Sequence, residues 1–258
     1  IEPIDRIGDY GGTQIIFNND LNTVGVDWME LTEVKFFRPT PLQKKVVPSL
    51  AKGWNFNKDH DVFTLKLRKG VKWSDGTPFN ADDILFWWEA EANNSDINPI
   101  SPENWNPIGW EEIEKVDDYT VKIHFTQPNP LFVKRRPRFS MLQQVIYTPS
   151  HYLKQYHPEY TDDKKNLQKL VKEEGFDQWY QLYEYVKQRG KSQTEYLMPV
   201  LDPYIVKSAS SNSVLLERNP YYPFVDTEGN QLPYIDHLRV KRVVDWQVYN
   251  AKVSTGEV

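Results

Sequence analysis

Adjacent carboxylates are the side chains of this sequence that could perform general acid–base chemistry. They occur in pairs at Asp82-Asp83, Glu111-Glu112, Asp117-Asp118 and Asp162-Asp163. A glycoside hydrolase holds two carboxyl groups about 5 to 9.5 Å apart across a cleft, and neighbours in sequence rarely achieve this. We therefore interpret each pair as the start of a helix or as a turn. A carbohydrate-active enzyme, a glycoside hydrolase with an aromatic-lined cleft, remains the alternative hypothesis.

Other side chains that commonly carry out catalysis lack the spacing it requires. The five His, at positions 60, 124, 151, 157 and 237, never fall at the three- or four-residue interval that puts two imidazoles on one helix face. The chain has no Cys, which removes thiolate ligands and thiol nucleophiles. Nucleophile-elbow, phosphate-loop and dinucleotide-binding glycine motifs are also absent from the sequence. We expect no catalytic residue, no metal and no cofactor.

The charge of the chain argues against a nucleic-acid partner. Its 258 residues include 31 Lys and Arg against 36 Asp and Glu, a formal net charge of −5. The densest basic run is residues 134–138. That run could hold a ligand carboxylate, although a solvated surface is the simpler interpretation.

Aromatic residues are the stronger indication of a binding function. Trp, Tyr and Phe make up 14% of the sequence. Five of the Trp fall within 38 residues: Trp73, Trp87, Trp88, Trp105 and Trp110. Their ring faces could stack on a sugar or on peptide side chains. The alternative is that they fill the core and cover a loop, as aromatic side chains often do.

The elements that would position these residues are both strands and helices. Residues 62–67 alternate between apolar and polar, which predicts a half-buried strand that pairs with 71–73 across a turn at Lys69-Gly70. Further strands are predicted at 13–17, 119–125, 214–217 and 238–244.

Helices are predicted from capping residues and from apolar spacing. Asn80 can cap a helix whose buried stripe would be Ile84, Leu85, Trp88 and Ala92. Residues 150–156 and 164–189 carry aromatic and apolar side chains at helical intervals, which predicts amphipathic helices. The mixture of elements indicates a mixed α/β fold.

Four stretches of the sequence carry a family resemblance. Residues 62–83, VFTLKLRKGVKWSDGTPFNADD, resemble the signature of the family 5 extracellular solute-binding proteins. Residues 48–54, 113–132 and 216–222 resemble further segments of that family, in the expected order. These proteins are the oligopeptide, dipeptide, nickel and oligosaccharide receptors of bacterial ABC importers.

The resemblance implies a periplasmic-binding-protein-like class II clamp of mixed α/β type. Residues 1–36 and 146–258 would form part of the first lobe, and residues 37–145 a smaller added domain. Residues 253–258 resemble a helix end after which family members continue into a further domain. We therefore expect the opposing lobe to be missing from this chain.

The function implied by the resemblance is capture of a solute. A peptide-like or oligosaccharide ligand would be held between two lobes and delivered to the permease of an ABC importer. Ligand contact with both lobes would favour the closed state. The resemblance also implies a monomeric protein outside the cytoplasm, lipid-anchored in its full-length form.

The expected ligand site combines short polar side chains with aromatic rings. In the resembled fold, the cleft is lined by the loop after the first strand and by segments that border the added domain. This places Asn18, Asn19 and Asp20 at the ligand, with Trp105 and Trp110 as stacking rings. The competing interpretation is a plain turn and a packed loop.

Overall fold

The computed structural model describes residues 6–19, 21, 34–40, 45–99, 109–133, 146–189 and 197–256. The chain forms two compact units. The first contains the described residues of 1–33, 72–77 and 184–258, and the second those of 34–71 and 78–183. The described residues from 146 to 183 thus belong to the second unit, whereas the sequence-based division grouped them with 1–36. The assignment of lobe and added domain stays a prediction.

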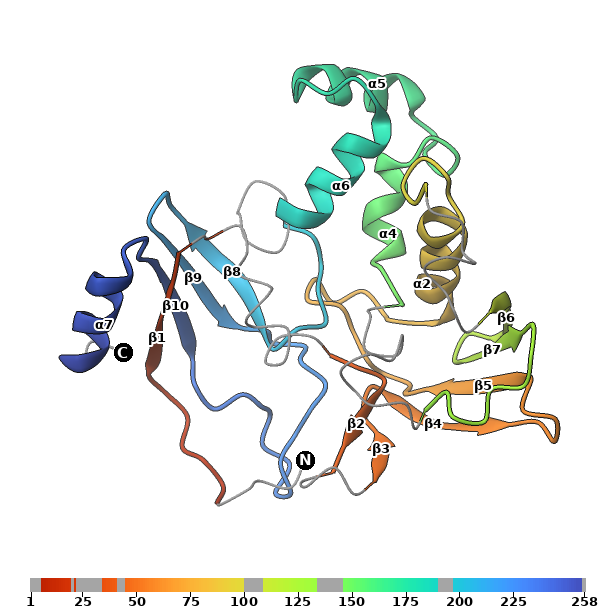
Figure 1. The fold of residues 1–258 in the computed structure, drawn as a ribbon, viewed down its shortest axis with the longest axis horizontal. Coiled ribbons are helices and arrows are strands. Elements are labelled where there is room, and N and C mark those ends of the chain that lie inside the picture. Colours follow the sequence, from red (N-terminus) through yellow and green to blue (C-terminus); the bar gives the residue numbers. More distant parts are fainter. Residues whose placement is uncertain are drawn as a thin grey trace. The chain divides into compact units, whose positions relative to one another are not determined.

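The first unit is built on a sheet with the strand order β1-β10-β9-β8 (Figure 1). Its strands are β1 (Thr13–Asn18), β8 (Tyr204–Ala209), β9 (Ser213–Arg218) and β10 (His237–Arg242). β1 and β10 run parallel, and the other neighbours are antiparallel. The strands predicted at both ends of the chain are confirmed, within two residues of their observed limits.

Alternate residues of this sheet form the core of the first unit. Val214 and Leu216 of β9 lie beside Val240 and Leu238 of β10, and all are buried. Leu21 and Tyr204 complete the buried cluster. Because successive side chains in a strand point to opposite faces, the apolar residues of β9 and β10 gather on one face of the sheet.

The second unit holds a larger and a smaller sheet. In the larger one, the order β4-β5-β7-β6 joins β4 (Ala51–Phe56), β5 (Val62–Leu67), β6 (Trp110–Asp117) and β7 (Thr120–Phe125). The smaller one pairs β2 (Phe37–Pro39) with β3 (Val46–Pro48). The predicted pairing of 62–67 with 71–73 was wrong, because β4 and β7 occupy the two edges of β5.

Helices also occur among the described residues from 81 to 189. They are α2 (Ala81–Phe86), the π-helix η2 (Trp87–Ala92), α4 (Ser150–Leu153), the 3₁₀ turn η4 (Lys154–Tyr156), α5 (Lys164–Glu173) and α6 (Trp179–Arg189). Of the predicted stripe, Ile84, Trp88 and Ala92 are buried and Leu85 is half-buried. The π-helix changes the helical period, and three consecutive residues, 90–92, are buried in it.

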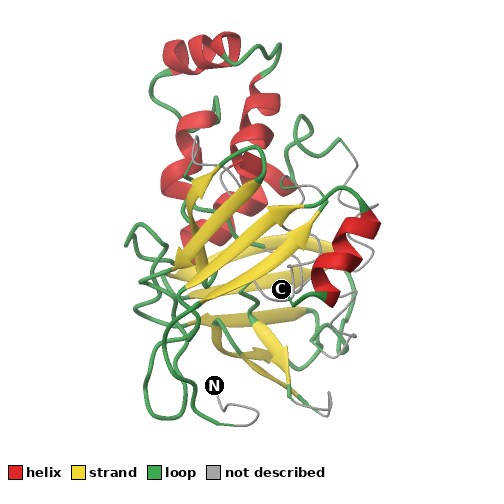
Figure 2. Cartoon of the chain, turned by 90° about the vertical axis from the view of Figure 1, so that its left-hand side faces the viewer, coloured by secondary structure: helices red, strands yellow, loops and turns green. Residues whose placement is uncertain are grey.

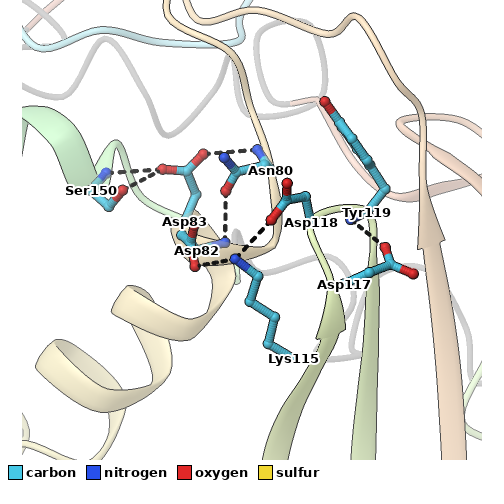
Figure 3. A network of polar contacts seen from close by, with 8 residues as sticks. All are labelled: Asn80, Asp82, Asp83, Lys115, Asp117, Asp118, Tyr119 and Ser150. Atoms are coloured by element: carbon cyan, nitrogen blue, oxygen red, sulfur yellow. Dashed lines mark hydrogen bonds and ion pairs between the residues drawn. The ribbon is translucent and has the colours of Figure 1, made fainter.

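A network of polar contacts fixes the start of α2 (Figure 3). The Asn80 side chain accepts a 2.8 Å hydrogen bond from the Asp82 backbone N–H, which confirms the predicted cap. Asp83 is buried, and its Oδ2 accepts from the Asn80 N–H at 3.1 Å. Its Oδ1 accepts from the Ser150 N–H at 3.1 Å and from the Ser150 hydroxyl at 2.8 Å. Asp83 thereby joins α2 to α4 and has a structural role.

Asp82 points the other way, to the cation of Lys115 on β6. The Lys115 ammonium lies 2.8 Å from Asp82 and 3.0 Å from Asp118 (Figure 3). Hydrogen bonds to Asp82 and then Asp118 raise the pKa of Lys115 above its usual value. The two carboxylates of Asp82-Asp83 therefore bind different partners, Lys115 and Ser150.

The other carboxylate pairs differ in their structural roles. Asp117 accepts from the Tyr119 N–H at 2.8 Å in a turn, and Asp163 caps α5 by accepting from the Asn166 N–H at 2.9 Å. Glu111 and Glu112 are neither in a turn nor at a helix start, so that interpretation was wrong for this pair. They lie in β6 at a register shift, and this bulge leaves both exposed.

A buried carboxylate also organises the loop between β9 and β10. Asp226 is 4% exposed and accepts hydrogen bonds from the Glu228 N–H at 2.8 Å, the Asn230 N–H at 2.9 Å and the Tyr234 hydroxyl at 2.6 Å. Burial alone would raise the pKa of Asp226, but these bonds outweigh it and lower the pKa from 3.8 to about 2. The loop is thus built around the ionised form.

We expect the stability of the first unit to fall when Asp226 becomes protonated. Because the pKa of Asp226 is lower in the folded state, its contribution is present above about pH 4 and lost as the pH falls toward about 2. Urea unfolding measured across this range should show a smaller loss of stability for Asp226→Asn than for the unchanged chain. Parallel pH profiles for the two proteins would contradict this role.

Candidate functional site

The parallel pair in the first unit brings two chain segments together at one edge of the sheet. β1 and β10 end side by side, with Asn18 in register with Arg242. The Val243 N–H donates to the Asn18 carbonyl at 2.8 Å, and Arg242 Nε donates to the Asn19 carbonyl at 3.3 Å. The Arg242 N–H donates to the carbonyl of Asn212 in the β8–β9 turn at 2.8 Å. We call this region, residues 18–19, 210–212 and 242–246, the carboxyl edge.

Helix α7 (Trp246–Ser254) begins at the carboxyl edge and lies beside β1 (Figures 1 and 2). Asp245 caps it, since its Oδ1 accepts from the Gln247 and Val248 N–H groups at 2.8 and 2.9 Å. Trp246 follows in the first turn and is 70% exposed. The helix therefore carries a large aromatic ring into solvent beside polar groups.

The carboxyl edge exposes several polar side chains. Asn19, Asn212 and Arg242 are exposed and offer amide and guanidinium groups. The Ser210 hydroxyl stabilises the β8–β9 turn by bonding within 3.1 Å to the backbone of Ser213. Ligands of open α/β sheets commonly lie outside the carboxyl ends of parallel strands, where these side chains are found. Amides, a guanidinium and an indole face can hold a solute without breaking a bond in it.

The predicted site residues fall in different places. Asn18 and Asn19 lie at the carboxyl edge of the first unit. Asp20 and Trp105 lie outside the described residues. Trp110 belongs to β6 in the second unit, where it is only 5% exposed. The basic run at 134–138 also lies outside the described residues.

Trp110 is part of an aromatic core. Its ring centroid lies 6.2 Å from that of Trp87, 6.0 Å from that of Trp88 and 5.7 Å from that of Phe132. Its indole N–H is buried and has no hydrogen-bond partner among the described residues. These contacts give Trp110 a packing role, and a ligand contact by this ring stays a prediction.

Sequence reasoning did not include Arg242, Asp245, Trp246 or Tyr249 in the site. The prediction extended the strand to 244, whereas β10 ends at Arg242 and the helix begins at Trp246. A signal was present: Asp245 is a good N-cap, and the apolar residues Trp246, Tyr249 and Val253 follow with helical spacing.

A buried titratable cluster in the second unit has a structural explanation. His157 is fully buried, its ring centroid is 4.5 Å from that of Trp179, and its Nε2 is 3.2 Å from Asn94 Nδ2. Burial lowers the pKa of His157, which favours the neutral imidazole. Tyr183 donates to the buried Glu91 at 2.7 Å. Among the described residues, no group of three or more His, Cys, Asp or Glu is suited to hold a metal.

Comparison with known proteins shows the family of this chain. The model of the bacterial extracellular solute-binding proteins, family 5 Middle, matches residues 45–258. The chain belongs to this family. The family prediction made from the sequence is confirmed.

The names of individual relatives mention two classes of ligand, oligosaccharides and peptides. The chain is 34% identical over 199 residues to a periplasmic alpha-galactoside-binding protein of Rhizobium meliloti (strain 1021), covering 76% of this chain and 25% of that relative. A solved oligopeptide-binding protein OppA is 36% identical with a TM-score of 0.84, covering all of this chain and 39% of OppA. The protein MelB of Agrobacterium fabrum C58, solved in complex with stachyose, is 28% identical with a TM-score of 0.70, over 97% of this chain and 37% of MelB.

These matches confirm the predicted fold class. The fold is mixed α/β and matches periplasmic binding proteins over about two fifths of their chains. The chain spans a quarter of the length of the alpha-galactoside-binding relative. The named relatives are binding proteins and not enzymes. No described helix is long and apolar enough to cross a membrane.

Proposed function

We propose that this chain is part of an extracytoplasmic receptor that captures a peptide-like or oligosaccharide solute for an ABC import permease. The family match over residues 45–258 is the observation that carries this proposal. The residues of the carboxyl edge support it, because they suit noncovalent capture of a polar solute. The outer location, a lipid anchor in the complete protein and a monomeric state are part of the same proposal.

The mechanism proposed is a shift between an open and a closed state. A solute favours closure only by the extra contacts it makes in the closed form. Residues 1–36 and 146–258 would contribute to one lobe, and 37–145 to the added domain. Asn18, Asn19 and Asp20 would contact the solute, with Trp105 and Trp110 as the proposed aromatic partners.

Calorimetric titration with two panels of solutes tests this proposal. One panel contains peptides of two to five residues, and the other contains alpha-galactosides, including stachyose. We expect saturable binding of at least one class. Binding should be weak, since this chain spans about two fifths of the length of OppA and a pocket holds its ligand most tightly when it encloses it. Absence of saturable binding in both panels would refute the proposal.

Asn19 provides a site-directed test. Its backbone carbonyl accepts from Arg242 while its side chain is exposed, so Asn19→Ala should leave the sheet intact. We expect Asn19→Ala to weaken solute binding by about 1 kcal/mol, the contribution of one hydrogen bond, with unchanged thermal unfolding. Asn166→Ala, an exposed asparagine on α5, is the matched control and should bind normally. Equal affinities of the two variants would remove Asn19 from the site.

A further inference from the structure

Trp246 is an exposed aromatic ring that the fold holds in a fixed position. It is 70% exposed, whereas large aromatic side chains are on average well buried. Its ring lies parallel to that of Tyr249, with an interplanar angle of 5° and centroids 4.8 Å apart. One face of the indole is therefore supported by Tyr249. The exposure of the side chain leaves the opposite face open to solvent.

The support beneath Trp246 reaches the core of the first unit. Tyr249 meets Phe17 of β1 edge to face, with ring centroids 6.1 Å apart. Phe17 is 8% exposed, and the Lys252 ammonium lies 5.7 Å from the centre of its ring. Asp245 fixes the first turn of α7 through its two hydrogen bonds. Trp246 is thus preorganised, which reduces the entropy that a ligand must remove on binding.

The polar residues Arg242 and Asp245 of the carboxyl edge precede this ring in the chain. The chain from Arg242 to Trp246 connects β10 to α7, and Arg242 also binds the Asn19 carbonyl. Guanidinium and amide groups donate and accept hydrogen bonds from hydroxyls. A ligand suited to this surface has a flat apolar face and a polar rim. A galactose ring has both, because C–H groups line one face and hydroxyls surround it.

We propose that Trp246, supported by Tyr249, is a stacking platform for a galactosyl ring of an oligosaccharide bound at the carboxyl edge. This inference rests on the proposed receptor function and selects between its two ligand classes. The named alpha-galactoside-binding relative and the stachyose complex of MelB support a sugar as the occupant. Stacking buries the open indole face, which is the favourable step for an aromatic ring in water.

Fluorine NMR of the chain labelled with 5-fluorotryptophan tests the platform directly. The protein has nine Trp, and the Trp246 signal is the one that disappears in Trp246→Phe. Stachyose should shift this signal in a saturable way at millimolar concentrations, whereas tetra-alanine should not. Failure of stachyose to shift the signal, or an equal shift with tetra-alanine, would overturn the proposal. A shift that depends on protein concentration alone would instead identify a self-association surface and would also overturn it.

Affinity measurements on variants separate this inference from the proposed function. Trp246→Ala should weaken stachyose binding at least about fivefold, and Trp246→Phe should weaken it less, because a smaller ring remains. Val248→Ala, which removes another exposed apolar side chain of α7, is the matched control and should bind stachyose normally. Normal stachyose binding by Trp246→Ala would refute the platform and leave the receptor function standing. Absence of any solute binding by the unchanged chain would refute both the platform and the receptor function.

Discussion

Replacing Trp110 by alanine should lower the unfolding free energy of the second unit by about 3–5 kcal/mol. The ring is 5% exposed and lies among Trp87, Trp88 and Phe132, so its removal leaves a cavity that these rings cannot easily fill. Urea unfolding followed by circular dichroism measures this change. Its size is large because one side chain accounts for much of the aromatic packing between β6 and η2.

Trp246→Ala is the matched control for this substitution. The same chemical change at a residue that is 70% exposed removes only its stacking on Tyr249, so it should alter stability by about 1 kcal/mol or less. A similarly small effect at Trp110 would show that its ring is not held in the core. That result would favour the proposed ligand contact of Trp110 over a packing role.

Replacing Asp83 by alanine should cost about 2–4 kcal/mol, the second large effect. The substitution leaves the Asn80 N–H and both donors of Ser150 without their acceptor in a buried place. It also removes the reciprocal half of the capping box at the start of α2. Equilibrium urea unfolding gives the cost, and crystallography or NMR of the variant would show whether α4 separates from α2.

The adjacent carboxylate supplies the control. Asp82→Ala removes an ion pair with Lys115 from a side chain that is 49% exposed, so we expect a loss of about 1 kcal/mol or less. Both variants replace an aspartate by alanine, at adjacent positions in the chain. Equal effects at the two positions would contradict the structural role assigned to Asp83.

Local patterns in the sequence predicted the positions of strands and helices better than the pairing of the strands. The alternation of residues 62–67 indicated which face of the strand is buried, and burial in β5 follows it. It could not indicate the neighbours β4 and β7, because alternation sets the face of a strand and leaves its pairing open. The cap at Asn80 was predictable for the same local reason, since its acceptor and donor lie two residues apart.

Long-range contacts explain what the sequence did not show. Asp83 was predicted only as part of a helix start or turn, but its partner Ser150 comes 67 residues later in the chain. In the site, Asn18 and Asn19 were predicted to lie in the loop after the first strand, and β1 ends at Asn18. That β10 and the start of α7 belong to the same edge of the sheet could not be recognised, because this depends on the parallel pairing of β1 with β10 across the whole length of the chain.

The proposed function requires that the chain captures a solute and leaves it chemically unchanged. Incubation of the chain with stachyose and with a short peptide, followed by mass spectrometry and a reducing-end assay, tests this most directly. Saturable binding with full recovery of intact solute is the predicted result. Steady release of reducing ends from stachyose, in proportion to protein and time, would contradict the receptor function and favour the glycoside hydrolase alternative.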